Sequence, residues 1–378
     1  MSKPKKQKRI RLFVLLTVAV LTIGGVLGYI EFYLARPIGE GPAGPQVDAR
    51  AFRNIWSDDP IHVIGIGDSI TAGLGAKSPS HSFFNRVIQN PDDEFAELRG
   101  VCLSAVLPNL EAENFAISGS ESQTHLDVIQ NTIPVYSEAR GIVLMTSGGN
   151  DLIHSYGRSA PRECAMYSAT LEQAQPWIAN FRTRLATMFD EIEKRFPLGC
   201  EIFIADIYDP TDGVGDAPSI FLPDWPDGLA IHAQYNQVIR ELAQQRDHVH
   251  VVDLYQTFLG HGSHCRQFWR SNYDANDPHY WFFTNIEDPN DRGYDAIRRA
   301  FLNAIVEHSS LVPKFARSSN RPGSIPDRLN RVDAALRTPV LASFSPVLIA
   351  DSNWLASRTS MSAPFIDSKD SVFCNRYE

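Results

Sequence analysis

Five short apolar runs, separated by segments with helical periodicity, constrain the fold of this chain more than any other feature. The runs cover residues 61–66, 112–118, 141–148, 201–207 and 248–254. Turn residues bound them, which is typical of strands that are buried on both faces of a parallel sheet. Repeated strand–helix units place helices on both sides of such a sheet. The pattern therefore predicts an α/β protein with a three-layer α/β/α domain and a five-stranded parallel sheet.

The segments between the runs carry apolar stripes with the spacing of a helix. The clearest stripe extends from Trp177 to Phe196, with Pro176 near its start and 197–199 (Pro-Leu-Gly) at its end. Two further stripes, over 235–242 and 294–305, predict helices later in the chain. After about residue 310 the pattern dissolves.

The amino terminus predicts a membrane anchor. Residues 1–11 are strongly basic, and residues 12–30 contain no charge, a length that spans a bilayer as a helix. Because a basic flank stays in the cytoplasm, the rest of the chain is expected outside it, periplasmic or extracellular. A cleaved signal peptide is the alternative. The bulky sequence after Gly28, YIEFYLARP, offers no small-residue cleavage site and favours the uncleaved single-pass anchor.

These features divide the chain into four parts. Residues 1–35 form the basic tip and transmembrane helix, and the stretch 36–56, which opens with Gly and Pro, reads as a linker. Residues 57–310 form the α/β domain. Residues 311–378 read as an irregular C-terminal tail.

Charge and cysteine content limit the partners. A net charge of −9 argues against nucleic acid, which attracts a basic face. An extracytoplasmic location permits disulfides, but the five cysteines are an odd number, so at least one thiol stays unpaired. No CxxC pair is present, and "HGSHC" (261–265) has no second ligand cluster with matching spacing, so we predict no metal site.

Polar motifs follow three of the predicted strands. They are "GDSITAG" (67–73), "SGSES" (118–122) and "GGND" (148–151). Ligands of doubly wound sheets bind beyond the carboxyl ends of the strands, so we expect these motifs to meet there.

In this order, the motifs resemble those of the SGNH hydrolases, also called GDSL esterases and lipases, over about residues 61–308. The resemblance implies a flavodoxin-like sheet and a nucleophile at Ser69. It also implies oxyanion donors at the amides of Ser69 and Gly119 and at the side chain of Asn150. No cofactor is implied. The substrate would be an acyl ester, of a lipid or of an acylated glycan.

The chemistry of these residue types agrees with that role. A backbone amide and a carboxamide stabilise the charge that develops on a carbonyl oxygen, and one such donor contributes about 3–4 kcal/mol. Each residue alone also has a structural interpretation, because Ser69 could be a helix cap, and Gly119 and Asn150 turn residues. We interpret Asp68 and Asp151 as structural.

The general base is the open question, because a free serine is a poor nucleophile without one. The last block of the resembled family reads Asp-x-x-His, and this chain has Asn285 and Asp288 at those places. We predict that His279 is the base, oriented by Asp277. The alternatives are His261 or His264, or no competent base at all.

The sequence therefore predicts a membrane-anchored, extracytoplasmic serine esterase or lipase that acts through an acyl-serine intermediate. Two alternatives remain open. One is an acyltransferase with the same site. The other is a catalytically inactive binding protein on the same fold, which the missing block histidine favours.

Overall fold

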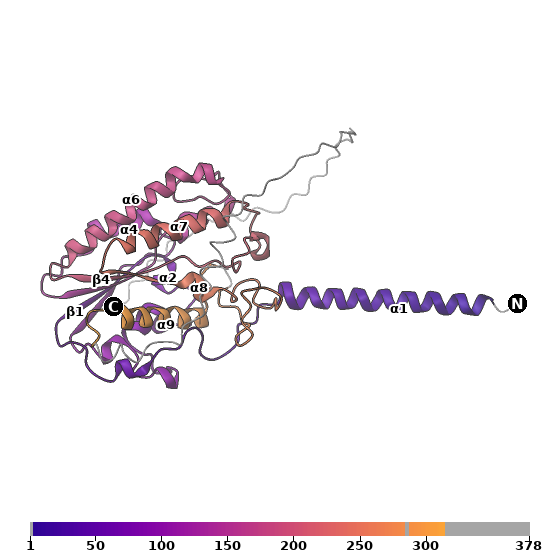
Figure 1. Ribbon diagram of the computed structural model, residues 1–378, viewed down its shortest axis with the longest axis horizontal. Coiled ribbons are helices and arrows are strands. Elements are labelled where there is room, and N and C mark those ends of the chain that lie inside the picture. The colour runs from indigo at the N-terminus through magenta and orange to yellow at the C-terminus, as the bar shows by residue number, and fades with distance from the viewer. Residues whose placement is uncertain (1–2, 284–286, 314–378) are drawn as a thin grey trace, which may run out of the picture. The chain divides into compact units, whose positions relative to one another are not determined.

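A sheet of five parallel strands forms the centre of the computed structural model, which describes residues 3–283 and 287–313, with side chains from residue 9 (Figure 1). The strands lie in the order β2-β1-β3-β4-β5. Their bounds are Ile61–Ile66 (β1), Leu110–Asn114 (β2), Arg140–Met145 (β3), Cys200–Ala205 (β4) and Val249–Val252 (β5). The predicted parallel sheet is confirmed. The edge strand β2 ends at Asn114, earlier than the apolar run suggests.

Helices cover both faces of this sheet, which confirms the three layers. On one face lie α4 (Ser122–Asn131), α6 (Leu171–Arg195) and α7 (Gly228–Gln244), which pack side by side. On the other face lie α3 (Phe83–Ile88), α8 (Leu254–Phe258) and α9 (Asp291–His308) (Figure 1). The short helices α2 (Ser69–Ala72) and α5 (Gly149–Ile153) directly follow β1 and β3.

Alternate residues of the strands enter two separate cores. Val63 and Ile142 belong to the core under α9, whereas Ile64 and Val143 belong to the core under α6 and α7. Successive side chains of a strand point to opposite faces, so a strand buried on both faces must be apolar throughout. This explains why the runs of β1, β3 and β4 are continuous rather than alternating. The edge strand β2 is largely exposed, so the predicted burial on both faces is wrong for this strand.

The start of α6 corrects the sequence-based boundary. The helix begins at Leu171, before Pro176, and not near Trp177. A capping box sets this start, because the Thr170 side chain accepts from the Gln173 amide while the Gln173 side chain accepts from the Thr170 amide. Pro176 therefore lies inside the helix.

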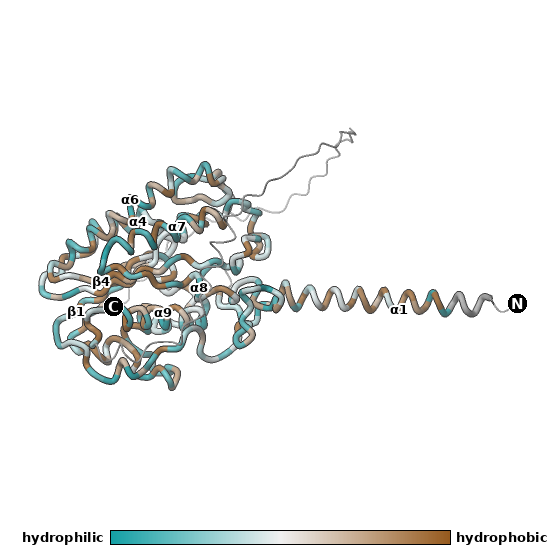
Figure 2. The backbone as a smooth tube through the Cα atoms, viewed as in Figure 1, coloured by the Kyte–Doolittle hydropathy of each residue, from teal (hydrophilic) through white to brown (hydrophobic). Residues whose placement is uncertain are grey.

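The amino-terminal helix α1 (Lys3–Tyr29) continues into a π-helical turn, η1 (Ile30–Leu34). Residues Arg9–Leu34 are long and apolar enough to cross a membrane, and they are not buried within the protein. An amino-terminal signal sequence has the same character. Figure 2 shows apolar residues concentrated in this helix and in the strands of the sheet.

The predicted linker is packed against the domain. The Ala43 amide donates to Asp295 Oδ2 over 2.9 Å, and the Trp56 amide donates to the Val106 carbonyl over 2.8 Å. Ala43, Phe52 and Trp56 are buried. Residues 37–56 thus contribute to the core beside α9, although the domain boundaries themselves stay a prediction.

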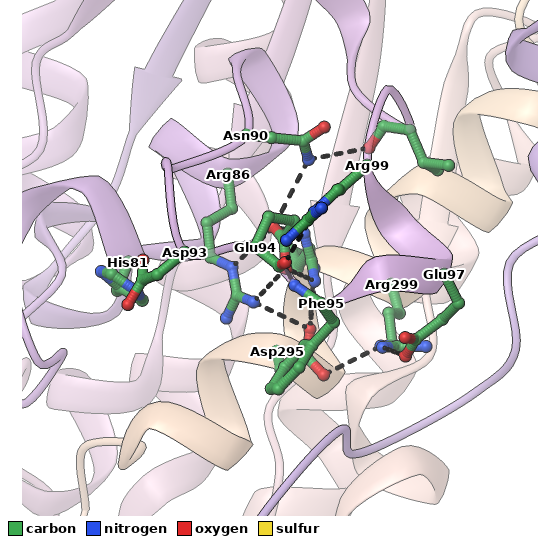
Figure 3. A network of polar contacts seen from close by, with 12 residues as sticks. His81, Arg86, Asn90, Asp93, Glu94, Phe95, Glu97, Arg99, Asp295 and Arg299 are labelled. Carbon is green, nitrogen blue, oxygen red and sulfur yellow. Dashed lines mark hydrogen bonds and ion pairs between the residues drawn. The ribbon is translucent and has the colours of Figure 1, made fainter.

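A buried ionic network joins α9 to the chain that follows α3 (Figure 3). Glu94 accepts from the guanidinium groups of Arg86 and Arg298, and Asp295 pairs with Arg298 and Arg299. All five side chains are less than a tenth exposed. Burial favours the neutral form of Glu94, but the hydrogen bonds from Arg298 and Arg86 outweigh it and lower its pKa to about 2.

The cysteines of the described chain are free thiols: Cys102, Cys164, Cys200 and Cys265. The C-terminal tail from residue 314 lies outside the described residues, and so does Cys374.

Candidate active site

The turn between β1 and α2 places Ser69 at the start of a helix. Gly67 has φ +149°, and a Cβ there would lie 2.3 Å from Thr146 Oγ1, so only glycine fits. Asp68 caps α2, because its Oδ1 accepts from the Ile70 amide (3.1 Å) and from Thr146 Oγ1 (2.9 Å). These bonds agree with the structural role predicted for Asp68, and they fix Ser69 as the first helical residue.

A second turn carries Gly119 against the first. The Ile117 amide donates to the Gly67 carbonyl over 2.9 Å, and Ser120 Oγ donates to the same carbonyl over 3.2 Å. Gly119, between these contacts, has φ +79° and is exposed. A positive φ favours glycine, whose amide lies in the turn that is bonded to the loop before Ser69.

Asn150 joins this turn from the start of α5. Its Nδ2 donates to the Ser120 carbonyl over 2.9 Å, and a carboxamide nitrogen carries a second hydrogen. The neighbouring Asp151 is buried and accepts from the amide and the hydroxyl of Ser122 at 2.7 and 2.5 Å. Asp151 therefore fixes the turn before α4, in line with its predicted structural role.

A cavity of about 150 Å3 brings Ser69 and Asn150 together with five acidic residues, among them Asp68, Glu287 and Asp288. Apolar side chains form much of its wall, among them Leu152, Ile153, Ile207, Ile220, Leu222, Trp225 and Leu229. Ser69 is 9% exposed. The cavity can therefore accept an apolar group beside a hydroxyl, a carboxamide and carboxyl groups.

Burial changes the acidity of the carboxyl groups in this cavity. It raises the pKa of Glu287 to about 7; the Tyr156 hydroxyl, which donates to Glu287 Oε2, counteracts burial, whereas the charges of Asp288 and Asp68 add to it. It also raises the pKa of Asp68 to about 6, although hydrogen bonds from Thr146 and the Ile70 amide lower it. A carboxyl group that titrates near neutrality lies within the range of enzyme general bases.

The structure does not bring His279 and Asp277 to this cavity. His279 Nδ1 lies 2.5 Å from Asp277 Oδ1, as the predicted pairing requires, and Asp277 Oδ2 lies 2.5 Å from Arg292. Both residues line a different cavity, bounded by residues 40–46 and by Trp281. Within the described part of the chain, no contact joins His279 to Ser69.

The other histidines of this region are also engaged elsewhere. The ring of His261 stacks on Trp281 with centroids 3.4 Å apart, and His264 Nε2 lies 3.0 Å from Asp216 Oδ1. His232 does line the Ser69 cavity, but its Nε2 lies 2.9 Å from the Ile207 carbonyl. Burial lowers the pKa of each of these three rings.

Sequence reasoning missed Glu287 and Tyr156. The signal for Glu287 was its place beside Asp288 in the block that lacks a histidine, whereas nothing in the sequence marked Tyr156. Asn285, the other substituted place in the block, lies outside the described residues. Within the described ranges, no group of three His, Cys, Asp or Glu side chains could hold a metal ion.

Comparison with known families finds one match. The model of the GDSL-like Lipase/Acylhydrolase family matches residues 66–296, which is more than half of the chain. The match runs from the last residue of β1 into α9 and includes every residue that lines the cavity of Ser69. A search of curated proteins finds no match.

Solved structures with a similar fold include three lipolytic or esterase proteins. A lipolytic G-D-S-L protein of Veillonella parvula is 15% identical (TM-score 0.41), covering 65% of this chain and 98% of its own. An extracellular lipase of Streptomyces rimosus is 19% identical (TM-score 0.43), and the match covers 65% of this chain and 99% of the lipase. A point variant of an acetyl xylan esterase of Geobacillus stearothermophilus is 19% identical (TM-score 0.43), and the match covers 66% of this chain and 97% of the esterase.

Proposed function

The chain belongs to the GDSL-like lipase and acylhydrolase family, whose members hydrolyse carboxylic esters, and from this membership we propose that Ser69 is the nucleophile of a serine esterase. The observation that supports this most is the shared cavity, which holds the Ser69 hydroxyl, the Asn150 carboxamide and a carboxyl group with a near-neutral pKa. His232 also lines this cavity, but its Nε2 lies 2.9 Å from the Ile207 carbonyl.

The proposed reaction begins with attack of Ser69 Oγ on the ester carbonyl carbon while a base takes the hydroxyl proton. The amides of Ser69 and Gly119 and the Asn150 side chain donate to the oxyanion. The C–O bond of the ester then breaks, and the alcohol leaves with the proton from the base. Water next attacks the acyl-serine, its proton passes through the same base to Ser69 Oγ, and the carboxylic acid leaves.

For the base we propose Glu287, with Asp288 beside it in the place where the family block usually has histidine. Glu287 lines the cavity of Ser69, and its pKa of about 7 makes it a far better proton acceptor than an ordinary carboxylate. The Tyr156 hydroxyl holds one carboxylate oxygen in place. The prediction that His279 acts as the base, oriented by Asp277, stays untested and competes with this one.

We further propose that the enzyme is anchored by α1 and η1, with the catalytic domain outside the cytoplasm. The basic residues before the apolar helix support this orientation. The apolar wall of the cavity is suited to an acyl group of a lipid or of an acylated glycan.

Labelling with a fluorophosphonate probe tests the nucleophile. The full-length protein should be modified at Ser69, and Ser69→Ala should abolish the labelling. Absence of labelling in a folded protein would instead support the inactive binding protein, which the replacement of the block histidine by Asp288 favours.

A further inference from the structure

Aromatic side chains from three distant parts of the chain lie near the end of the amino-terminal helix. Phe32 of η1 contacts Phe268 and Trp269, with ring centroids 5.6 and 5.2 Å apart, and Tyr33 lies 6.2 Å from Trp269. The fifth is Phe221, which lies against Arg36, two residues after η1. We call Phe32, Tyr33, Phe221, Phe268 and Trp269 the aromatic collar.

Polar contacts hold these segments together. Gln267 Nε2 donates to the Phe32 carbonyl over 3.1 Å, and the guanidinium of Arg266 pairs with Glu31. The Arg36 guanidinium lies 5.2 Å from the centre of the Phe221 ring and donates to the Ser219 carbonyl. Thus η1 is bonded to the loop that carries Phe268 and Trp269, and Arg36 is bonded to the loop that carries Phe221.

The collar remains exposed despite these contacts. Phe221 is 76% exposed, Phe268 62% and Trp269 48%. Exposed apolar clusters mark interaction surfaces, and aromatic side chains beside arginines suit the headgroup region of a bilayer, where rings are half-immersed and guanidinium groups meet phosphates. The collar includes Phe32 and Tyr33, in the last turn of the membrane-length segment that ends at Leu34, and this continuity identifies the partner as a lipid surface.

We propose that the aromatic collar inserts into the headgroup region of the membrane that holds α1, and so docks the catalytic domain on the lipid surface. This proposal rests on the anchoring proposed above. Ile220 and Leu222, on either side of Phe221, line the cavity of Ser69. Docking therefore places part of the cavity wall at the bilayer, and acyl esters carried in that bilayer reach Ser69 without crossing water.

Tryptophan fluorescence in vesicles tests the docking. Full-length protein is reconstituted in phosphatidylcholine and phosphatidylglycerol whose acyl chains carry bromine just below the headgroups. The difference in emission between the wild type and Trp269→Phe is the emission of Trp269 alone. We expect the brominated lipid to quench this emission. The matched control is Trp56→Phe, because Trp56 is buried and precedes β1, at the opposite end of the sheet from the cavity. The emission that it removes should be unaffected by bromine.

A second variant tests the other loop of the collar, which carries Phe221. Phe221→Trp in the Trp269→Phe background adds one reporter at Phe221, which should also be quenched. Unquenched emission at both positions would overturn the proposal.

Two further measurements separate failure of the collar from failure of the proposed function. If a carbonate wash releases the protein from the vesicles, the anchor is missing and the docking proposal fails with it. If the protein is retained but its emission is not quenched, only the proposed insertion of the collar fails. Fluorophosphonate labelling of Ser69 in the same sample reports the catalytic proposal independently.

Discussion

Three acidic side chains beside one serine distinguish this site at the scale of single residues. Burial raises the pKa of Glu287, and the negative charges of Asp288 and Asp68 raise it further. All three residues line the cavity of Ser69. A histidine would be a cation when it holds the transferred proton, whereas a carboxyl group becomes neutral. The negative charges of Asp288 and Asp68 therefore favour the protonated, neutral form of Glu287, the proposed base.

The proposed nucleophile and the proposed oxyanion donor should have separable effects. Ser69→Ala should lower turnover of short aryl esters by about 10³ or more, because no other group forms the acyl intermediate. Asn150→Ala should lower turnover by about 10² to 10³ with little change in KM, because its donor acts mainly in the transition state. Circular dichroism confirms the fold of each variant. Retention of most activity in Ser69→Ala would contradict the whole site.

Substitutions of the competing bases decide between them. Glu287→Gln should reduce kcat nearly as much as Ser69→Ala, since members of one catalytic unit fail together. His279→Gln, the matched control, should leave kcat near that of the wild type. The reverse outcome would establish His279 as the base. Asp288→Asn should lower the midpoint of the pH–rate profile, because it removes a negative charge that raises the pKa of Glu287.

The pH dependence of stability provides an independent check on Glu287. Its pKa rises on folding from 4.5 to about 7, so the folded form binds the proton more tightly, and the associated stability is lost as pH rises through this window. Above pH 7, Glu287→Gln should therefore raise the melting temperature while it abolishes activity, and at pH 4 it should change the melting temperature little. Calorimetry at the two pH values measures this. Destabilisation at high pH would indicate a structural role instead.

At the scale of elements, the ionic network around Glu94 connects α9 to the segment after α3 (Figure 3). Removing one partner of a buried ion pair leaves an uncompensated charge. Because α9 begins directly after the block that contains Glu287 and Asp288, the network also fixes the helix that supports the base.

Glu94→Gln should destabilise the protein by about 3–5 kcal/mol in denaturant unfolding, since Arg86 and Arg298 are both buried. The control is Glu97→Gln. Its partner Arg299 still pairs with Asp295, and the Glu97 side chain is half exposed, so the substitution should lower the free energy of unfolding by only about 0–1 kcal/mol. Because the pKa of Glu94 is lowered to about 2, its contribution should be present above pH 4.5 and be lost as pH falls toward 2. Equal effects of the two variants would show that the network adds nothing.

At the scale of the whole molecule, the amino-terminal helix is the proposed membrane anchor, and its orientation would decide where the reaction takes place. We predict that the domain lies outside the cytoplasm. A reporter that is active only in the cytoplasm, fused to the carboxyl end, should be inactive, and the same reporter fused before Lys3 should be active. Activity of the carboxyl-terminal fusion would overturn the orientation. The mass of the mature chain distinguishes an uncleaved anchor from a cleaved signal.

The sequence alone determined the sheet and its layers, because strands buried on both faces must be continuously apolar and helices must carry a stripe. Its resemblance to a known family, carried by motifs at the strand ends, pointed to Ser69, Gly119 and Asn150 as site residues. Only the tertiary structure showed that Glu287 lines the cavity of Ser69 and that His279 lines a different one. The folded course of the connection between β5 and α9 decides which of its side chains reach the site, and periodicity says nothing about an irregular segment. The near-neutral pKa of Glu287 likewise arises from burial and neighbouring charges that no local pattern contains.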